Sequence, residues 1–412
     1  MYKGVMEFFM KNIRNCGGKG RITLKKAVLT LMVFNLLINT TFVNVFAKEK
    51  EKTTDVNCKS YVLMEASSGT VIKSENENEK LSPASITKIM TMIIIFDAIH
   101  SGKIKLEDMA TTSAHAKSMG GSQVFLEEGE QQSVETLIKC IIIASGNDAS
   151  VTMAEHIAGS EEEFVKKMNE RAKDLGMVNT HFEDCCGLTD SDNHYTSAMD
   201  VAIMSRELIT KYPEVFKYST IWMEGFTHKT NKGESEFMLT NTNKLLKTNQ
   251  YVKGLKTGST SKAKYCVSTV AEKDGVELIA VIMAAPDYKA RFAQAQQLIN
   301  YGFSNCKVYK DDKEHIKKVN ISGGVKEQVS VQNDMFSFVD TQGKDLGKIN
   351  SDIIINKNIS APVKKGDTVG KIEYTLDGNK IGETFIISAE NVRKADYKYT
   401  FSRLMKYFLQ IS

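Results

Sequence analysis

The chain has 412 residues, 42% of them hydrophobic and 25% charged, which is typical of a globular protein with two domains. Its formal net charge is +4, yet seven basic residues and only one acidic residue lie within residues 1–47. The rest of the chain is close to neutral, which argues against the basic surface of a nucleic-acid-binding protein.

Residues 1–47 are predicted to be a signal peptide. A basic region ends at Lys25 and Lys26, and a mostly apolar stretch follows over residues 27–46. Asparagines and threonines make this stretch a poor membrane span, and Val45-Phe46-Ala47 fits a signal-peptidase cleavage site. The alternative is an uncleaved anchor helix. We expect an exported protein at the outer face of the cytoplasmic membrane or in the cell wall.

Six cysteines follow residue 47, at positions 58, 140, 185, 186, 266 and 306. They are too sparse for a disulfide scaffold, and Cys140 and Cys266 lie in apolar runs that predict buried thiols. The stretch His181-Phe-Glu-Asp-Cys-Cys186 could suggest a metal site. Adjacent cysteines rarely both bind one tetrahedral ion, and the chain has no Cys-x-x-Cys pair. We therefore expect no metal and no other cofactor.

Residues 48–307 are predicted to form a first domain of the α/β class. Two short apolar runs, 60–65 and 69–73, form a hairpin, and Pro83 introduces a buried helix that begins near Ser85. Further helices are expected over residues 137–144, 147–158, 161–175 and 291–301, and strands over 252–256, 265–271 and 277–284. This order predicts one mixed sheet with helices packed on it.

Residues 308–394 predict a second, smaller, all-β domain. Short β-type runs lie at 315–321, 328–332, 335–339, 352–355, 371–376 and 383–388, with glycine-containing turns between them.

Residues 395–412 predict an amphipathic helix. Apolar residues recur at helical spacing beside Lys398, Arg403 and Lys406, which suits association with an anionic membrane surface. The apolar residues are Tyr397, Phe401, Leu404, Met405, Phe408 and Leu409. The alternative is a terminal helix docked on its own domain.

Three short motifs follow one another along the first domain: Ser85-Ile-Thr-Lys88, Ser145-Gly-Asn147 and Lys256-Thr-Gly258. Residues three apart share a helix face, so the Lys88 amine can reach the Ser85 hydroxyl and act as its base. Burial and a neighbouring cation favour the neutral form of that lysine.

The second and third motifs supply groups for the substrate. Ser145 can pass a proton between Lys88 and a leaving amine, and the Asn147 amide can hold a substrate carbonyl or Lys88. Lys256-Thr-Gly258 ends a predicted strand, where Lys256 and Thr257 can bind a terminal carboxylate. Gly258 lets the substrate approach the backbone closely.

In this order and spacing the three motifs resemble those of the serine penicillin-binding proteins and β-lactamases. The wider sequence resembles the low-molecular-mass D-alanyl-D-alanine carboxypeptidases, in stretches that include Ser82–Thr91, Ala144–Ala149, His194–Ser197, Asn241–Leu246, Gly254–Gly258 and Ala290–Ala293. The likeness covers essentially all of the chain after residue 47.

The resemblance implies a β-lactamase-like fold and removal of the terminal D-alanine from peptidoglycan stem peptides ending in D-Ala-D-Ala. It also implies acylation by β-lactam antibiotics. Ser85 would be the nucleophile, Lys88 the base and Ser145 the proton shuttle. Asn147, Lys256, Thr257, Gly258 and Ser259 would bind the substrate, with the backbone N–H groups of Ser85 and Ser259 forming the oxyanion hole. The family often has an aromatic residue or histidine where this chain has Ser259.

Three alternatives remain open to different degrees. A class A β-lactamase needs a Glu-x-x-x-Asn motif between the second and third motifs, and none occurs over residues 169–249. A non-catalytic peptidoglycan-binding protein would not be expected to keep every motif residue. A D,D-endopeptidase that cuts peptidoglycan cross-links has the same chemistry, so the sequence does not separate it from a carboxypeptidase.

Overall fold

The computed structural model describes residues 57–409. The predicted signal peptide and its cleavage site lie outside the described residues. Within them, no helix is both long enough and apolar enough to cross a bilayer.

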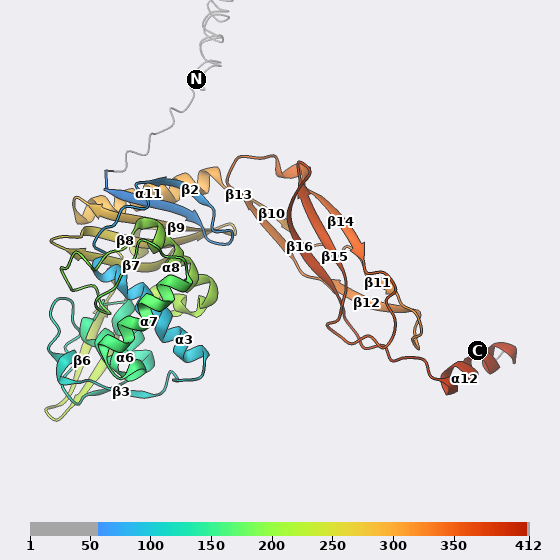
Figure 1. Ribbon diagram of the computed structural model, residues 1–412, viewed down its shortest axis with the longest axis horizontal. Helices are drawn as coiled ribbons and strands as arrows, with labels where there is room; N and C mark the ends of the chain where they lie inside the picture. The colour runs from blue at the N-terminus through green and yellow to red at the C-terminus, as the bar shows by residue number, and fades with distance from the viewer. Residues whose placement is uncertain (1–56, 410–412) are drawn as a thin grey trace, which may run out of the picture. The chain divides into compact units, whose positions relative to one another are not determined.

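The centre of the first part of the chain is a five-stranded sheet with the order β2-β1-β9-β8-β7 (Figure 1). Its strands are β1 (Ser60–Glu65), β2 (Val71–Glu75), β7 (Val252–Thr260), β8 (Lys264–Lys273) and β9 (Val276–Ala285). All neighbouring pairs are antiparallel. The prediction of a sheet covered by helices is confirmed, with the correction that this sheet contains no parallel pair. Tight turns join β7 to β8 and β8 to β9, and such hairpins require antiparallel neighbours.

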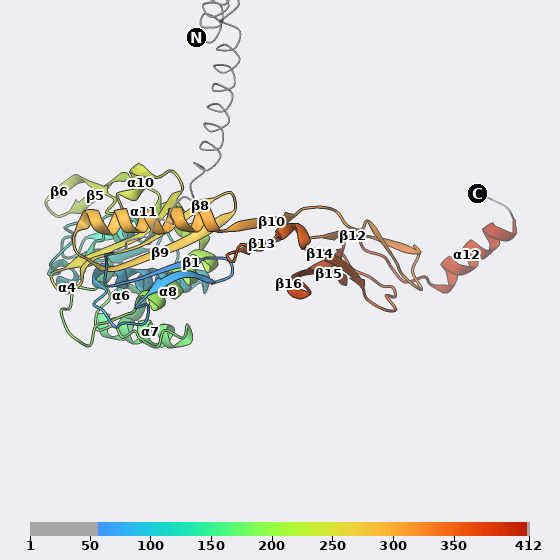
Figure 2. The same cartoon turned by 90° about the horizontal axis from the view of Figure 1, so that it is seen from above.

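Both faces of the sheet are buried, and β9 shows how its sequence produces this. Side chains alternate between the faces of a strand. Leu278, Ala280 and Ile282 pack in the cluster that includes α11 (Tyr288–Asn305), while the intervening residues pack in the larger cluster on the other face. In Figure 2, α11 runs along one face of the sheet and α6, α7 and α8 lie on the other. The strand is therefore apolar on both faces.

Several helices on the face opposite α11 begin at a side-chain cap, although α6 and α9 do not. Ser133, Ser160 and Ser197 cap α5, α7 and α8 by accepting a backbone N–H, and Pro83 precedes the 3₁₀ turn η2. The elements of this face are η2 (Ala84–Thr87), α3 (Lys88–His100), α4 (Ala114–Lys117), α5 (Val134–Ile142), α6 (Asn147–Ala158), α7 (Glu161–Asp174), α8 (Ala198–Lys211), η3 (Pro213–Val215) and α9 (Phe216–Ser219).

Two small hairpins and a short helix were not expected from the sequence. The hairpins pair β3 (Met109–Thr111) with β4 (Gln131–Ser133), and β5 (Met223–Thr230) with β6 (Gly233–Thr240). The helix is α10 (Leu245–Thr248), which directly precedes β7. These segments are short or largely exposed, so they lack the long apolar periodicity that marks a core element.

The second part of the chain is all-β, as the sequence predicts. Its five-stranded sheet has the order β11-β12-β16-β15-β14, and a separate pair joins β10 to β13. Phe336 and Tyr374 stack in its core with ring centroids 3.8 Å apart. The elements are β10 (Lys307–Asp311), β11 (Lys318–Asn320), β12 (Gln328–Asn333), β13 (Phe336–Asp340), η4 (Leu346–Lys348), β14 (Asn350–Ile355), β15 (Thr368–Leu376) and β16 (Asn379–Ser388).

The last described element is the helix α12 (Tyr397–Phe408), which Asp396 caps through the Tyr399 N–H. None of its residues is buried. Tyr399 donates a hydrogen bond to the carbonyl of Val325, and Arg403 pairs with Glu327. The predicted helix is present and leaves its large apolar side chains exposed to solvent.

Candidate active site

Ser85 and Lys88 lie on the turn where η2 passes into α3. Ser85 is half-buried, whereas the Lys88 side chain is completely buried. Lys88 Nζ donates to Asn147 Oδ1 at 2.6 Å and to the carbonyl oxygen of Cys186 at 2.7 Å, and it lies within hydrogen-bonding distance of Ser85 Oγ, at 3.1 Å. Burial lowers the pKa of Lys88, because the charged form loses its water. The pair therefore has the geometry of a hydroxyl beside a base.

The residue before the candidate nucleophile has an unusual backbone. Ala84 adopts φ +47°, in the left-handed region that residues with a side chain seldom enter. Ser145, in the second motif, does the same with φ +64°. Such conformations persist only where the surrounding structure holds them, and they often occur at functional sites.

Ser145 and Lys256 meet across the site. Lys256 is 2% exposed, and its Nζ donates to Ser145 Oγ at 2.9 Å and to the carbonyl of Thr257 at 3.0 Å. Burial, then the nearby charges of Lys88 and Arg291, lower the pKa of Lys256 well below its ordinary value. The sequence predicts that Ser145 passes a proton between Lys88 and a leaving amine. Among residues 57–409, however, Ser145 has no hydrogen bond to Lys88, and the lysine that contacts it is Lys256.

The Lys256-Thr-Gly258 motif lies within β7, the edge strand of the sheet. The sequence predicts that the strand ends at this motif. In the structure the strand continues through Ser259 to Thr260. A Cβ atom at Gly258 would lie 2.8 Å from the carbonyl oxygen of Pro83 and 3.1 Å from the backbone N of Ser85. The motif therefore lies directly against the turn that carries Ser85, and a side chain there would crowd that turn.

Arg291 of α11 is a neighbour of the site that the sequence assigned to no role. Its Nη1 donates to the carbonyls of Gly258 and Cys266 at 3.1 and 3.3 Å, so it supports β7 from behind. The only sequence signal for it is that Arg291 lies in Ala290–Ala293, one of the stretches that resemble the family. No carboxylate in the described part of the chain forms an ion pair with Lys88, Lys256 or Arg291. Lys256 and Arg291 therefore have no carboxylate counter-ion in this part of the chain, which suits an anionic ligand.

The stretch His181–Cys186, considered as a metal site from the sequence, does bring ligand atoms together. Single atoms of Glu161, Asp184 and Cys186 lie within 4.8 Å of one another. However, the Asp184 carboxylate accepts backbone N–H groups, and Glu161 accepts from Cys185 N–H and contacts His115. These oxygens are already occupied by hydrogen bonds, so the cluster does not fit a cation site.

Comparisons with known proteins agree with this geometry. A family model described as D-alanyl-D-alanine carboxypeptidase (peptidase S11) matches residues 46–287, and one described as the C-terminal domain of penicillin-binding protein 5 matches residues 303–394. The D-alanyl-D-alanine carboxypeptidase DacF of Bacillus subtilis is 40% identical over 386 residues, covering 92% of this chain and 98% of the relative. The corresponding DacC of Escherichia coli is 33% identical over 362 residues, covering 85% of this chain and 88% of the relative.

Solved structures show the same relationship. The crystal structure of penicillin-binding protein 5 from Haemophilus influenzae matches with a TM-score of 0.61 at 32% identity, covering 82% of this chain and 98% of that one.

Proposed function

This chain belongs to the peptidase S11 family of D-alanyl-D-alanine carboxypeptidases, and from that premise we propose that it removes the terminal D-alanine from peptidoglycan stem peptides through an acyl-enzyme on Ser85. The observation that carries the proposal is the contact between the buried Lys88 amine and the half-buried Ser85 hydroxyl, at 3.1 Å. The same nucleophile would be acylated by β-lactam antibiotics.

Lys88 is the proposed base, and its other neighbours orient it. A neutral amine has two hydrogens and one lone pair. Asn147 Oδ1 and the Cys186 carbonyl oxygen, which are the two oxygens closest to Nζ, accept these two hydrogens. The lone pair is then directed toward Ser85 Oγ, and the hydroxyl can donate its proton to the amine as it attacks.

In the remaining steps, each proton that is released is taken up again by way of Lys88 or Lys256. Ser85 Oγ bonds to the carbonyl carbon of the D-Ala–D-Ala peptide bond as its proton passes to Lys88. The C–N bond then breaks, and the leaving amine takes a proton from Ser145, which regains one from Lys256. Water attacks the resulting ester and loses a proton to Lys256 through Ser145. Ser85 Oγ leaves with the proton held by Lys88.

Substrate recognition rests on the edge strand. Lys256 and Thr257 are proposed to bind the terminal carboxylate of the stem peptide by charge-assisted hydrogen bonds. Backbone N–H groups of Ser85 and Ser259 form the proposed oxyanion hole, beside Gly258. A carboxylate ligand would supply the counter-ion that Lys256 lacks within residues 57–409. No cofactor takes part in the proposed mechanism.

A fluorescent penicillin tests the nucleophile. The wild-type protein should be labelled covalently, and Ser85→Ala should take no label while keeping its melting temperature, because it lacks only one hydroxyl. Covalent labelling of the Ser85→Ala variant would refute the assignment. The variant Ser304→Ala serves as the matched control, since it removes an exposed hydroxyl of α11 that has no proposed role in the site.

A carboxypeptidase and a D,D-endopeptidase differ in the terminus they require. A peptide ending in D-Ala-D-Ala presents a free carboxylate to Lys256, and its amide does not. Amidation should lower kcat/KM by roughly 30- to 1000-fold, equivalent to about 2–4 kcal/mol, if the buried cation loses its partner. Equal turnover of the acid and the amide, with cross-linked muropeptides cleaved in chromatographic assays, would favour the endopeptidase.

The setting of the reaction is proposed to be extracytoplasmic. The predicted signal peptide would export the protein, and the exposed apolar side chains of α12 would hold it at the membrane surface, where its peptidoglycan substrate lies.

A further inference from the structure

A loop between α7 and α8, here called the bracing loop (residues 181–196), lies directly against the turn that carries Ser85. His181 and Tyr195 exchange two backbone hydrogen bonds and close the loop. Leu81 and Thr196 do the same and fasten it to the segment that leads into η2. The sequence predicts no function for this loop; a metal site at residues 181–186 was considered from the sequence and not expected.

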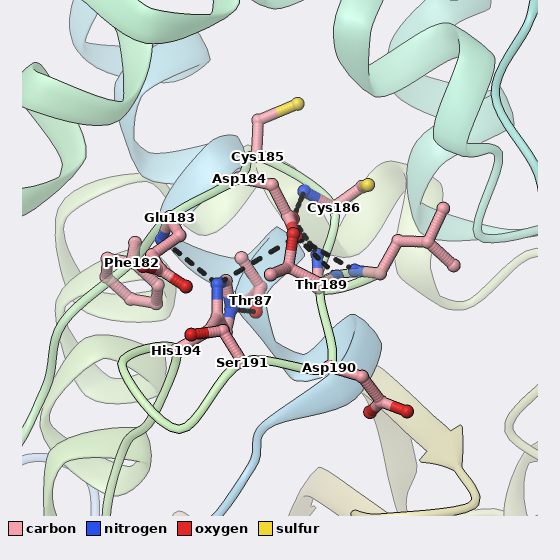
Figure 3. A network of polar contacts seen from close by, with 12 residues as sticks. Thr87, Phe182, Glu183, Asp184, Cys185, Cys186, Thr189, Asp190, Ser191 and His194 are labelled. Atoms are coloured by element: carbon pink, nitrogen blue, oxygen red, sulfur yellow. Dashed lines mark hydrogen bonds and ion pairs between the residues drawn. The ribbon is translucent and has the colours of Figure 1, made fainter.

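Asp184 is the centre of this loop. Its carboxylate accepts four consecutive backbone N–H groups, those of Cys186, Gly187, Leu188 and Thr189 (Figure 3). Burial acts to raise the pKa of Asp184, but the hydrogen bonds from these donors outweigh it and lower the pKa to about 2. The carboxylate is thus ionised near neutral pH, and it fixes the backbone of residues 186–189 in a tight turn around itself.

This turn places two backbone groups against the reactive pair. The carbonyl of Cys186 accepts from Lys88 Nζ at 2.7 Å, and the carbonyl of Cys185 accepts from Thr91 of α3. Gly187 has φ +78°, and a Cβ atom there would lie 1.8 Å from the carbonyl oxygen of Ala84, the residue before Ser85. The loop backbone therefore contacts both the base and the turn of the nucleophile.

His194 supports the same turn from the opposite end of the loop. Its Nδ1 accepts the N–H of Glu183 at 3.0 Å, so that nitrogen carries no proton. The ring proton is therefore on Nε2, which donates to Thr87 Oγ1 at 2.9 Å. The 3.9 Å approach of Nδ1 to Asp184 is consequently not an ion pair, and burial lowers the pKa of His194, which keeps the ring neutral.

We propose that Asp184 and His194 are positioning residues for the acylation step. Asp184 aims the Cys186 carbonyl at Lys88, and His194 holds Thr87, which lies between Ser85 and Lys88. Neither side chain needs to touch the substrate. The inference rests on the proposed function, because it assigns a role to residues that act through Ser85 and Lys88.

The test measures acylation by a fluorescent penicillin, separating the rate constant at saturating penicillin from the dissociation constant of the non-covalent complex. Asp184→Asn replaces an acceptor oxygen with an NH₂ group facing N–H donors, so the turn should loosen. The rate constant should fall about 10- to 100-fold, while the dissociation constant stays within about twofold because Lys256 and Thr257 are untouched. Asp190→Asn, in the same loop but exposed, is the matched control and should behave as wild type.

A second pair of variants tests the other end of the loop. Gln can present its amide N–H near the position of Nε2, so His194→Gln should keep most of the acylation rate and His194→Ala should lose about tenfold or more. Rescue by the conservative variant is not expected of a residue that only fills space. If Asp184→Asn does not fold, this pair decides the question.

The outcomes separate the two hypotheses. Wild-type acylation constants in Asp184→Asn, or equal constants in both His194 variants, would overturn the positioning role while Ser85 stayed the nucleophile. A wild-type protein that takes no label, or a Ser85→Ala variant that does, would overturn the proposed function itself. An Asp184→Asn variant that loses affinity and rate equally would show a general distortion of the site and would also reject the positioning role.

Discussion

Lys88 has three oxygen neighbours and no carboxylate partner among the described residues, and its side chain is fully buried. Water is the main stabiliser of an exposed ammonium group, so burial favours the neutral amine and lowers the pKa of Lys88. In the unfolded chain this pKa returns to its ordinary value near 10.5, so the unfolded state binds more protons. The free energy of unfolding therefore increases as the pH rises from the folded-state pKa of Lys88 toward 10.5.

The pH dependence of acylation should follow the protonation of Lys88. Acylation by penicillin should increase as the pH rises through the lowered pKa, because the neutral amine is the base. Lys88→Arg keeps a positive charge but cannot release its proton near neutral pH, so acylation should fall by about three orders of magnitude or more. Stopped-flow labelling over a range of pH measures both effects.

Lys247→Arg makes the same substitution at an exposed lysine and controls for the exchange itself. A Lys88→Arg variant with near-normal acylation and an unchanged acid limb would move the base elsewhere, and Ser145 with Lys256 would be the next group to examine.

Among the elements, β7 joins recognition to chemistry. Its edge position leaves backbone groups available for an extended peptide, and its Gly258 packs on the turn of Ser85. Lys256 lies on this strand, and Arg291 lies behind it. The strand therefore holds the proposed carboxylate-binding groups and the proposed nucleophile in one fixed relation.

Gly258→Ala should show how close this packing is. Its methyl group would lie 2.8 Å from the Pro83 carbonyl and 3.1 Å from the Ser85 nitrogen, so the strand and the turn would have to separate. Acylation should fall about 100-fold, a size expected for misplacement by about 1 Å, with a loss of stability of about 1–3 kcal/mol. Labelling kinetics and thermal unfolding measure the two effects.

Gly225→Ala is a control outside the site, in β5, where φ is not in the positive range and the nearest atom to an added Cβ would be Met238 Cε at 3.6 Å. A Gly258→Ala variant that acylates as fast as Gly225→Ala would contradict the role of close packing at Gly258.

A comparison of the observed helices and strands with the predicted ones shows how much of the fold the sequence determines on inspection. The apolar runs predicted α3, α6, β8 and the β class of the second part, because buried periodic segments carry a strong signal. The three motifs predicted the residues that meet at the site. The contact of Ser145 with Lys256 rather than Lys88 was missed, because it depends on side-chain directions across three separate elements. Asp184 was missed for a related reason: its partners are backbone N–H groups, which have no sequence signature.

At the scale of the whole molecule, α12 exposes apolar side chains that its contacts with the rest of the chain do not explain. Its apolar side chains are 40–84% exposed, with Met405 the least and Tyr397 the most exposed of the predicted stripe. A helix that only completed its own domain would bury these groups, whereas α12 contacts the loop between β11 and β12 through Tyr399 and Arg403. An interfacial role explains the exposure better than docking does.

Deleting residues 395–412 should therefore release the enzyme from membranes without changing its acylation kinetics. Lys398, Arg403 and Lys406 should each contribute about 1 kcal/mol of binding to anionic lipid, so the intact protein should also dissociate as salt increases. Sedimentation with vesicles that contain anionic lipid, with and without salt, measures both. Unfolding of the truncated protein would indicate a docked helix, and continued sedimentation with membranes would indicate an anchor at the other end of the chain.

The six cysteines of the described residues are all unpaired, and five of them are buried. Burial raises the pKa of Cys58 to about 12 and the pKa values of Cys266 and Cys306 to about 11, so these thiols stay protonated and react slowly. The fold of the described residues therefore needs no disulfide, and no oxidase or disulfide isomerase has to assist it. Dithiothreitol should leave the melting temperature and penicillin labelling unchanged, so this part of the enzyme can mature equally well in reducing, oxygen-free surroundings.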